Sequence, residues 1–340
     1  MTFKNPFIIA ELSGNHNGDI HRAFALMEAA KKSGADAVKL QTYTADTITI
    51  NHDSPEFIIK GGPWDGRTLY DLYVEAHTPW DWHPALFQKG KELGIVVFSS
   101  PFDKTAVDLL EKLGAPIYKI ASFELVDTAL IAYVAKTAKP IIMSTGMASI
   151  AEIELAVQAA FDNGCKDLTL LHCVSAYPAL IEDCNLETMR DLKHRFPNVK
   201  VGLSDHTLGV TVAITAVALG AEVIEKHLTL SRAEGGVDSS FSLEAEELKY
   251  LCDEVKNVVK AIGHVNYNRS ENEKKNAILR RSLYVVKPVK KGEVFTEDNI
   301  RSIRPGNGLS PALLTQILGK KASQDCQFGT PLKLELIENE

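Results

Sequence analysis

The chain has 340 residues, of which 45% are hydrophobic and 24% are charged, and its formal net charge is −7 at pH 7. This composition is that of an ordinary soluble globular protein, and the length suits one large domain with a small appendage. The negative charge argues against partners such as nucleic acid or an anionic membrane, because both repel an acidic surface. A local basic pocket for a small anion is compatible with it.

The cysteines and the apolar runs predict a cytoplasmic protein. The five cysteines are odd in number and scattered, without the spacing of a metal knuckle or a redox motif, so we expect reduced thiols. The first residues, MTFKNPFIIAEL, reach an acidic residue too soon for the core of a signal peptide. The longest nearly apolar stretch, 208–221, is shorter than the ~20 residues that span a membrane. We expect it to be a buried helix.

Short apolar runs typical of strands alternate along the chain with amphipathic runs typical of helices. The strand-like runs are, in order, PFIIAEL, AVKLQTY, IVVFSS, PIYKIAS, PIIMSTG, DLTLLHCVSAY, KVGLSDHT and EVIEKHLTL. This alternation indicates an α/β fold with parallel strands and crossover helices, and eight repeats favour a closed (β/α)8 TIM barrel. An open doubly wound sheet is the alternative, but no glycine-rich dinucleotide fingerprint follows the first run to support it.

Two segments depart from this repeat. Residues 44–77, which we call the lid, form a long insertion with the sequence GGPWDGRTLYDLY, and such insertions usually cover a substrate site. Beyond about residue 260 the chain becomes first polar and then rich in turns and β-forming residues. We therefore predict a barrel domain over residues 1–265, a linker over 266–279 and a small β-rich domain over 280–340.

Polar side chains end every strand-like run, which is where the catalytic groups of a barrel lie. They are Glu11, Lys39, Gln41, Ser99, Ser100, Lys119, Ser122, Glu124, Ser144, His172, Tyr177, Ser204, His206, Glu225 and His227. Lys39 and Lys119 lie within apolar strands, where an unpaired ammonium is costly, so an anion should face them. Two cations among hydroxyl groups suit a phosphorylated carboxylic acid. The alternatives are structural ion pairs with Glu11 or Glu124, and an aldolase with a Schiff-base lysine at Lys119.

His206 and His227 end the seventh and eighth strand-like runs, which are neighbours in a barrel. Two imidazoles on adjacent strands can bind one divalent metal and leave positions for water and a substrate oxygen. With two nitrogen ligands, we expect Mn²⁺ or Mg²⁺ rather than a closed zinc site. Glu11 and Glu124 are carboxylates near the expected pocket and are candidates for moving a proton. His16, in SGNHNG, is either a loop-capping residue or a substrate contact.

Seven segments in order resemble the bacterial sialic acid synthase family. They are IIAELSGNHNGD, GADAVKLQTY, YKIASFEL, IMSTGMAS, LLHCVSAYP, VGLSDHT and EKHLTL. The tail from about residue 280, with its RPGNG element, resembles the antifreeze-like (SAF) domain of that family. The resemblance implies an enzyme, a C–C bond-forming transferase that condenses phosphoenolpyruvate with an amino sugar. It also implies metal activation of the open-chain aldehyde and loss of phosphate by C–O cleavage, without a Schiff base.

The resemblance further assigns roles to individual residues. The metal ligands and catalytic carboxylates that it implies are His206, His227, Glu11, Glu124 and Asp238. The substrate-binding residues that it implies are Lys39, Gln41, Lys119, Ser122, Ser144, Tyr177, Ser204 and Arg304. Glu11 would handle the attacking water or the tetrahedral intermediate, while Glu124 and Asp238 would line the sugar pocket. In the domain-swapped homodimer that the family implies, Arg304 would reach the N-acyl group of the sugar in the other subunit.

Departures from the usual family pattern indicate the sugar. GGVDSSFSLEA stands where typical members read GPDHxxSLEP, and CVSA precedes YP where an asparagine is usual. These features, with the lid sequence, resemble the branch that makes pseudaminic acid from 2,4-diacetamido-2,4,6-trideoxy-L-altrose. A 6-deoxy sugar predicts a more apolar pocket, with Phe123, Trp64 and Phe241 in its wall.

Three alternatives to this function stay open. An N-acetylneuraminate or legionaminate synthase belongs to the same family and would differ in the sugar. A Schiff-base aldolase using Lys119 is an enzyme of another class. A carbohydrate- or ice-binding protein built around the tail is the third, and the polar strand ends of the barrel argue against it.

Overall fold

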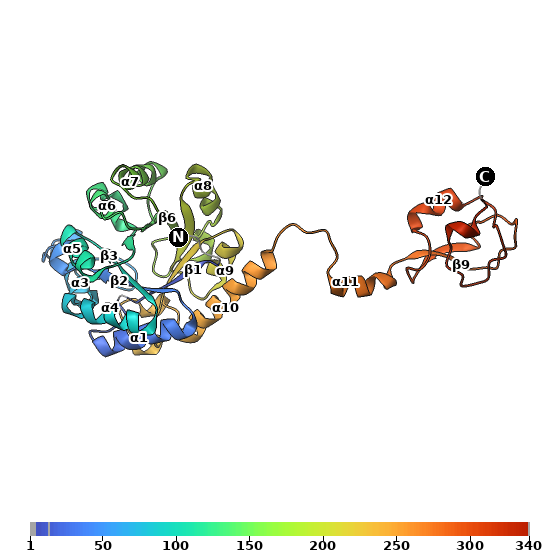
Figure 1. Cartoon of the computed structure of the whole chain (residues 1–340). Helices are drawn as coiled ribbons and strands as arrows, with labels where there is room; N and C mark the ends of the chain where they lie inside the picture. The colour runs from blue at the N-terminus through green and yellow to red at the C-terminus, as the bar shows by residue number, and fades with distance from the viewer. Residues whose placement is uncertain (1–4, 13, 339–340) are drawn as a thin grey trace. The chain divides into compact units, whose positions relative to one another are not determined.

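The computed structural model describes residues 5–12 and 14–338 and divides the chain into two compact units between Gly263 and His264. The first unit is a closed barrel of eight parallel strands, β1 to β8 in sequence order, with helices around it (Figure 1). The (β/α)8 barrel predicted from the alternating runs is therefore confirmed, and the open doubly wound sheet was the wrong alternative.

Each barrel strand is followed by a helix that packs on the outside. The strands are β1 (Phe7–Glu11), β2 (Ala37–Thr42), β3 (Val96–Pro101), β4 (Tyr118–Ile120), β5 (Ile141–Ser144), β6 (Leu168–Cys173), β7 (Lys200–Asp205) and β8 (Val223–His227). The outer helices are α1 (Ile20–Ser33), α4 (His83–Leu93), α5 (Lys104–Leu113), α6 (Thr128–Ala135), α7 (Ile150–Asp162), α8 (Glu187–Arg195), α9 (Thr211–Ala218) and α10 (Ala245–Ile262). Pairing of Glu11 with His227 and of Phe7 with Val223 closes the barrel between β1 and β8.

Local sequence sets the ends of the outer helices. Asp103 accepts hydrogen bonds from the backbone N–H groups of Thr105 and Ala106, which are among the donors that the first turn of α5 leaves unpaired. Gly114 ends the same helix with φ of 73°, a left-handed conformation that costs glycine little. Residues just outside the helix thus fix both of its ends.

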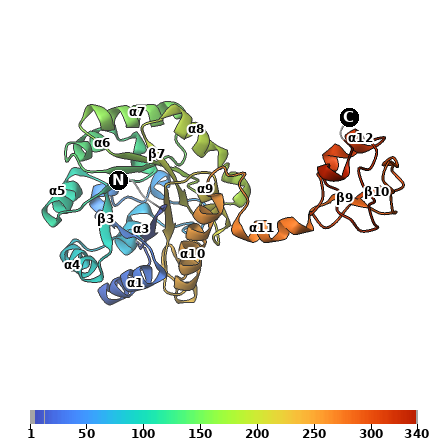
Figure 2. The same cartoon turned by 45° about the vertical axis from the view of Figure 1, so that its right-hand side comes forward.

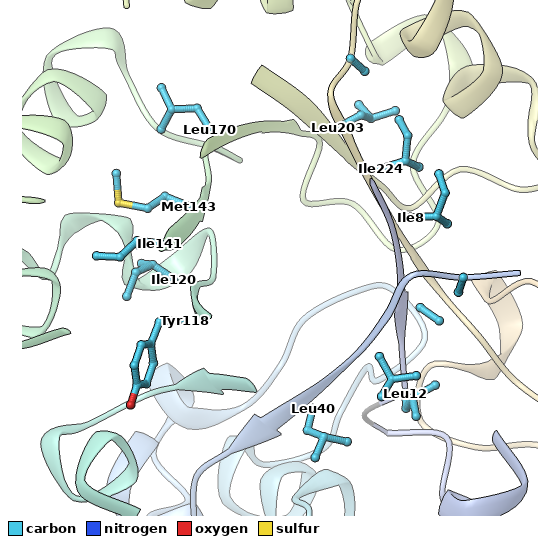
Figure 3. Packing of buried hydrophobic residues seen from close by; sticks show 14 of the residues in the cluster. Ile8, Leu12, Leu40, Tyr118, Ile120, Ile141, Met143, Leu170, Leu203 and Ile224 are labelled. Carbon is cyan, nitrogen blue, oxygen red and sulfur yellow. The ribbon is translucent and has the colours of Figure 1, made fainter. Parts of the chain in front are cut away.

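The strand alternation divides the apolar residues into two layers. Outward-facing residues pack against the helices, and Figure 3 shows part of this layer, including Tyr118, Leu203 and Ile224. Inward-facing residues near the start of the strands form a second cluster inside the barrel, made of Phe7, Ile9, Ala37, Phe98, Ile117, Ile142, Leu171 and Val223. Apolar side chains thus dominate the amino-terminal end of the barrel interior, and most of the predicted polar strand-end residues lie at the carboxyl end.

The lid, residues 44–77, lies between β2 and α4 and has short elements of its own. They are the helices α2 (Ala45–Ile48) and α3 (Leu69–Ala76) and the 3₁₀ turn η1 (Pro55–Phe57). Thr68 caps α3 by accepting a hydrogen bond from Asp71 N, and an antiparallel bridge joins Ile58 to Thr68. The lid is thus an ordered insertion, as the sequence predicts.

The second unit has its own small core. Its elements are α11 (Glu271–Asn276), β9 (Ser282–Val285), β10 (Ile300–Ile303) and α12 (Leu314–Ile317), and β9 pairs with β10 in an antiparallel sheet (Figure 2). Leu283, Phe295 and Leu332 are fully buried in it. The expected linker over 266–279 contains α11, which begins at a capping box formed by Ser270 and Glu273.

Two smaller expectations concern the apolar stretch and the cysteines. The stretch 208–221 contains α9, and Val212, Ala213, Ala216 and Val217 on that helix are buried. Among the residues that the structure describes, no helix combines the length and the apolar character needed to span a membrane. All five cysteines are free and buried, as the prediction of reduced thiols requires.

Candidate active site

A cavity of about 430 Å³ opens at the carboxyl ends of the barrel strands. One side of it, which we call the polar floor, consists of the inward-facing strand-end residues Lys39, Lys119, Ser144, Ser204, His206, Glu225 and His227. Another part of the lining, which we call the lid wall, consists of the lid residues Ile48, Ile59, Trp64, Leu69, Leu72 and Tyr73. The cavity therefore combines a charged surface built on strands with an apolar surface built on an insertion.

The predicted site residues gather at this cavity, with two exceptions. The predicted residues that line it are Lys39, Gln41, Lys119, Ser122, Glu124, Ser144, Tyr177, Ser204, His206, His227 and Asp238. Glu11 is fully buried behind Lys39 and does not line the cavity. Arg304 belongs to the second unit, where it is exposed.

Glu225 is the carboxylate that the two buried lysines share. The Lys39 ammonium lies 2.6 Å from Glu225 Oε1 and 2.8 Å from Glu11 Oε2, and the Lys119 ammonium lies 3.7 Å from Glu225 Oε1. Ser204 Oγ donates a hydrogen bond to the same Glu225 oxygen at 3.3 Å. The alternative of structural ion pairs is thus correct for Glu11. The structure places Glu225, rather than Glu124, within ion-pair distance of Lys119.

Burial and the neighbouring charges shift the pKa values of Glu225 and Lys39 in this cluster. Burial opposes the ionisation of Glu225, but Lys119 and Lys39 outweigh it and hold the pKa of the carboxyl below its ordinary value. Burial lowers the pKa of Lys39 to about 8, against the attraction of Glu225. Ser144 Oγ lies beside the cluster, is buried, and has no hydrogen-bond partner among the described residues. Two ammonium groups and an unpartnered hydroxyl facing one cavity form a surface for an anionic ligand.

His206 and His227, the two predicted metal ligands, lie next to each other at the cavity. His206 Nδ1 donates to the backbone oxygen of Val174 at 2.9 Å, because a carbonyl can only accept, and this leaves the lone pair on Nε2. The two rings are 5.3 Å apart between centroids. Burial lowers the pKa of His227, which favours the neutral imidazole that binds metals.

Asp238 lies next to this pair. Its Oδ2 is 3.4 Å from His227 Nδ1. Gly14 allows this approach: it has φ of 76°, and a Cβ there would lie 2.7 Å from the Asp238 carboxylate. Among the described residues, no group of three or more His, Cys, Asp and Glu side chains could hold a metal ion. Two imidazoles alone would leave the other positions of a bound ion to water or substrate oxygens.

Glu124 is a carboxyl that can hold a proton near neutral pH. Burial raises its pKa to about 7, although a backbone hydrogen bond and Lys119 act in the opposite direction. Its Oε2 is buried without a hydrogen-bond partner among the described residues. A group with such a pKa in a cavity is a candidate general acid or base.

Aromatic rings connect the histidines to the lid. Tyr177 lies 4.5 Å from His206 and 5.4 Å from Trp64, between ring centroids. Trp64 Nε1 donates to Val237 O at 3.0 Å and so fastens the lid to the loop after β8. The ring of Tyr177 thus lies between His206 and Trp64 of the lid wall.

The predictions for Phe241, Phe123 and His16 have different outcomes. Phe241 was predicted in the sugar wall, but it is 1% exposed and packs behind His206 and His227, with 6.1 and 5.0 Å between ring centroids. That prediction was wrong, because an apolar residue near a site can equally well support its ligands from behind. Phe123 does line the cavity and is 58% exposed. His16 caps its own loop, accepting a hydrogen bond from Gly18 N at 3.1 Å.

Sequence reasoning also missed features of the site. Glu225 received no role, although its position two residues before His227 on a strand puts both side chains on the same face. Cys173 lines the cavity with Sγ 3.8 Å from His206 Nδ1; burial raises its pKa, but His206 outweighs this and the pKa falls to about 7. Trp64 was predicted in the wall and does line the cavity. The other members of the lid wall carried no sequence signal, because the helical period of α3 does not tell which face meets a cavity.

Comparisons with known proteins agree with this geometry. Residues 26–267 match the NeuB family and residues 280–338 match the SAF domain. The chain is 47% identical over 332 residues to the pseudaminic acid synthase of Campylobacter jejuni subsp. jejuni serotype O:23/36, covering 98% of this chain and 96% of that protein. It is 41% identical over 326 residues to an N,N′-diacetyllegionaminic acid synthase of Campylobacter jejuni subsp. jejuni serotype O:2, covering 95% and 97%. A crystal structure of N-acetylneuraminic acid synthetase from Leptospira borgpetersenii, in complex with citrate, superimposes with a TM-score of 0.71 and 32% identity, covering 80% of this chain and 90% of that one.

Proposed function

The chain belongs to the NeuB family, and we propose that it acts as a pseudaminic acid synthase. The reaction condenses phosphoenolpyruvate with 2,4-diacetamido-2,4,6-trideoxy-L-altrose and water, and gives pseudaminic acid and phosphate. The observation that carries the proposal is that Lys39, Lys119, the two histidines and the apolar lid wall line one cavity. The greater identity to a pseudaminic than to a legionaminic acid synthase supports the choice of sugar.

The polar floor suits the carboxylate and phosphate groups of phosphoenolpyruvate. Lys39 contacts two carboxylates at 2.6 and 2.8 Å, whereas Lys119 lies 3.7 Å from Glu225, beyond hydrogen-bond distance. We therefore assign Lys119 the more direct contact with the ligand and Lys39 a supporting one. Ser144, whose hydroxyl has no partner among the described residues, would donate to the same anion.

His206 and His227 would hold the divalent cofactor, Mn²⁺ or Mg²⁺. When bound, the ion acts as a Lewis acid toward the aldehyde oxygen of the open-chain sugar. The hydrogen bond from His206 to Val174 fixes the orientation of that ring. Asp238, at 3.4 Å from His227 Nδ1, orients the second ring and lines the sugar side of the cavity.

The chain's own groups account for the charge and proton movements. C3 of phosphoenolpyruvate attacks the aldehyde carbon, and C2 becomes electron-poor. Glu225 is the floor carboxylate that faces the cavity, so it is the group that stabilises this positive charge, while Glu11 supports Lys39 from behind. Water then adds to C2, and the bond between C2 and the phosphate oxygen breaks, which leaves a carbonyl at C2. Of the two protons of this water, one leaves with the phosphate and the other replaces the proton that the general acid gives to the sugar. Glu124, with a pKa near 7, is suited to give a proton to the new hydroxyl oxygen of the sugar.

The lid wall suits the apolar parts of this sugar. A 6-deoxy sugar ends in a methyl group and carries two N-acetyl methyl groups, and each gains from burial against apolar side chains. Ile59, Trp64 and Leu69 offer such a surface in the cavity, and Trp64 lies next to Tyr177.

The proposal includes a domain-swapped homodimer in the cytoplasm. Large apolar side chains are exposed on the loops after β4 to β7, around the cavity: Phe123, Val126, Met147, Leu180 and Leu208. Such a rim suits contact with a second subunit, and Arg304 of the partner subunit would then contact the N-acyl group of the sugar. Mixed dimers of Arg304→Ala and His206→Ala subunits should recover part of the activity, and no recovery would contradict the swap. Five free cysteines suit the reducing cytoplasm.

Isotope labelling tests the reaction. Phosphoenolpyruvate with ¹⁸O at the oxygen between C2 and phosphorus should yield ¹⁸O-phosphate, together with a nine-carbon acid that carries oxygen from water at C2. The Schiff-base aldolase makes the opposite predictions: no phosphate release, and trapping of pyruvate on Lys119 by borohydride. Trapping without phosphate release would overturn the proposed function.

A further inference from the structure

Each metal-binding histidine is preceded by a charged residue that faces away from the cavity. Asp205 precedes His206 at the end of β7, Lys226 precedes His227 at the end of β8, and the two charged residues are register partners. Side chains alternate along a strand, so the histidines line the cavity while Asp205 and Lys226 do not. Both charged side chains are buried, with 1% and 0% exposure.

The Lys226 ammonium donates three hydrogen bonds, all to residues 205–209. Its ammonium donates to Asp205 Oδ2 at 2.9 Å, to Thr207 O at 2.7 Å and to Gly209 O at 2.9 Å. The other oxygen of Asp205 accepts from Thr207 N at 2.9 Å and from Thr207 Oγ1 at 2.8 Å. One buried group on β8 thus holds the side chain that precedes His206 and the backbone that follows it.

We propose that Asp205 and Lys226 form a clamp that sets the position of His206 relative to His227, and with it the affinity of the metal site. Neither residue touches the cavity, so both are positioning residues. The inference rests on the proposed function in assigning the metal ion to these two histidines.

Physical reasoning favours this role over a contribution to stability alone. A buried ion pair is a weak source of stability, because packed apolar residues of similar volume often serve as well or better. Such a pair can instead fix geometry, because its hydrogen bonds form in only one arrangement of β7 and β8. A site with two protein ligands on different strands needs such an arrangement, because misplacing either ring by a fraction of an ångström weakens both bonds to the metal.

The chain offers a matched control on the same strand. Lys200, at the opposite end of β7 from His206, lies 2.5 Å from Asp167 Oδ1. Replacing it also removes a partly buried ion pair of the barrel, but at the end away from the histidines. A general weakening of the barrel would therefore appear in both Lys200→Met and Lys226→Met.

The experiment is a calorimetric titration of the metal-free full-length protein with Mn²⁺, without substrates. Lys226→Met should weaken Mn²⁺ binding about 10- to 100-fold, the range found when groups that orient metal ligands are removed. Lys200→Met should bind Mn²⁺ within twofold of the wild type. In Asp205→Asn/Lys226→Met, which leaves no unpaired charge, the thermal midpoint measured in EDTA should recover toward the wild type while Mn²⁺ binding stays weak.

The outcomes separate the possible failures. Lys226→Met with wild-type Mn²⁺ affinity would overturn the clamp, as would Mn²⁺ affinity that recovers with stability in the double variant. A wild type that binds no Mn²⁺ would overturn the metal site and the clamp with it. If Lys226→Met does not fold, Asp205→Asn, which keeps the volume and one oxygen acceptor, allows the same comparison with Lys200→Met.

Discussion

The polar floor and the lid wall bound one cavity, but the chain builds them in different ways. Floor residues stand on barrel strands, where alternation and register fix the direction of each side chain, and Lys39 meets its two carboxylates at 2.6 and 2.8 Å. The lid wall stands on an insertion, with glycines at positive φ at Gly61 and Gly66 on either side of Trp64. From this difference between strand and insertion we infer separate roles. The rigid floor performs the chemistry, and the more adaptable lid wall selects the sugar.

Metal removal should have the largest effect, and it acts on the floor alone. Dialysis against EDTA should lower kcat at least about 1,000-fold, because a Lewis acid supplies several kcal/mol to the barrier. Added Mn²⁺ should restore it, and binding of the sugar to the lid wall should survive in part. Full activity of a preparation free of metal by elemental analysis would contradict the role assigned to His206 and His227.

Glu124 interacts electrostatically with both regions. Lys119 of the floor acts to lower the pKa of Glu124, and the charge of Glu124 acts to raise the pKa of Tyr73 in the lid wall. The pKa of Glu124 is raised from 4.5 to about 7, so the folded state holds the proton more tightly than the unfolded state does. The free energy of unfolding should therefore fall as pH rises from about 4.5 to about 7, by at most roughly 3.5 kcal/mol, which is about 300-fold in the folding constant.

Glu124→Gln stays neutral and should remove this loss. Urea unfolding of both proteins at pH 5 and pH 8 measures it, because the other titrating groups are common to the two. An equal pH dependence in wild type and variant would show that Glu124 titrates normally.

Lys119→Met should act on one substrate only. Losing a charge-assisted contact of up to about 3 kcal/mol should raise KM for phosphoenolpyruvate roughly 100-fold. The KM for the sugar should change little. Lys139→Met, which removes a lysine paired with Glu111 on the outside of the barrel, is the control and should leave both constants unchanged. Equal changes in both KM values would mean that Lys119 holds the site together rather than binding the anion.

A lid-wall variant should show the reverse pattern with a smaller effect. Leu69→Asn should lower kcat/KM for the 6-deoxy sugar about 10-fold, since an apolar contact discriminates modestly, and leave KM for phosphoenolpyruvate unchanged. The loss should be smaller for the 6-hydroxy analogue of the sugar. Val74→Asn is the matched control, because Val74 lies on the same helix, α3, but is 48% exposed and does not line the cavity.

The difference between the polar floor and the lid wall also explains which site residues the sequence could predict. The barrel and the floor were accessible, because apolar runs of strand length mark the strands and the polar residue at the end of each run is placed by the fold. Lys119 and His227 could be assigned to the cavity on that ground alone. The partner of Lys119 could not, because Glu11, Glu124 and Glu225 all follow strand-like runs and only the register shows which one faces it.

Residues away from the strand ends were harder to place. Phe241 was expected in the wall but packs behind the histidines, since hydrophobicity does not tell the front of a site from its support. The lid wall depends on how an insertion folds back over the barrel, for which residues such as Ile59 and Leu69 carry no local signal. The tie between Asp205 and Lys226 joins residues far apart in sequence and became visible only when β7 and β8 were paired.

A direct competition between sugars tests the central claim. Equal concentrations of 2,4-diacetamido-2,4,6-trideoxy-L-altrose, its legionaminic counterpart and N-acetylmannosamine are mixed with phosphoenolpyruvate, Mn²⁺ and the full-length protein, and the products are counted by mass spectrometry. We predict that pseudaminic acid exceeds each other product by about 100-fold, the discrimination that apolar and hydrogen-bonding contacts together provide. A mixture dominated by N-acetylneuraminic or legionaminic acid would contradict the account.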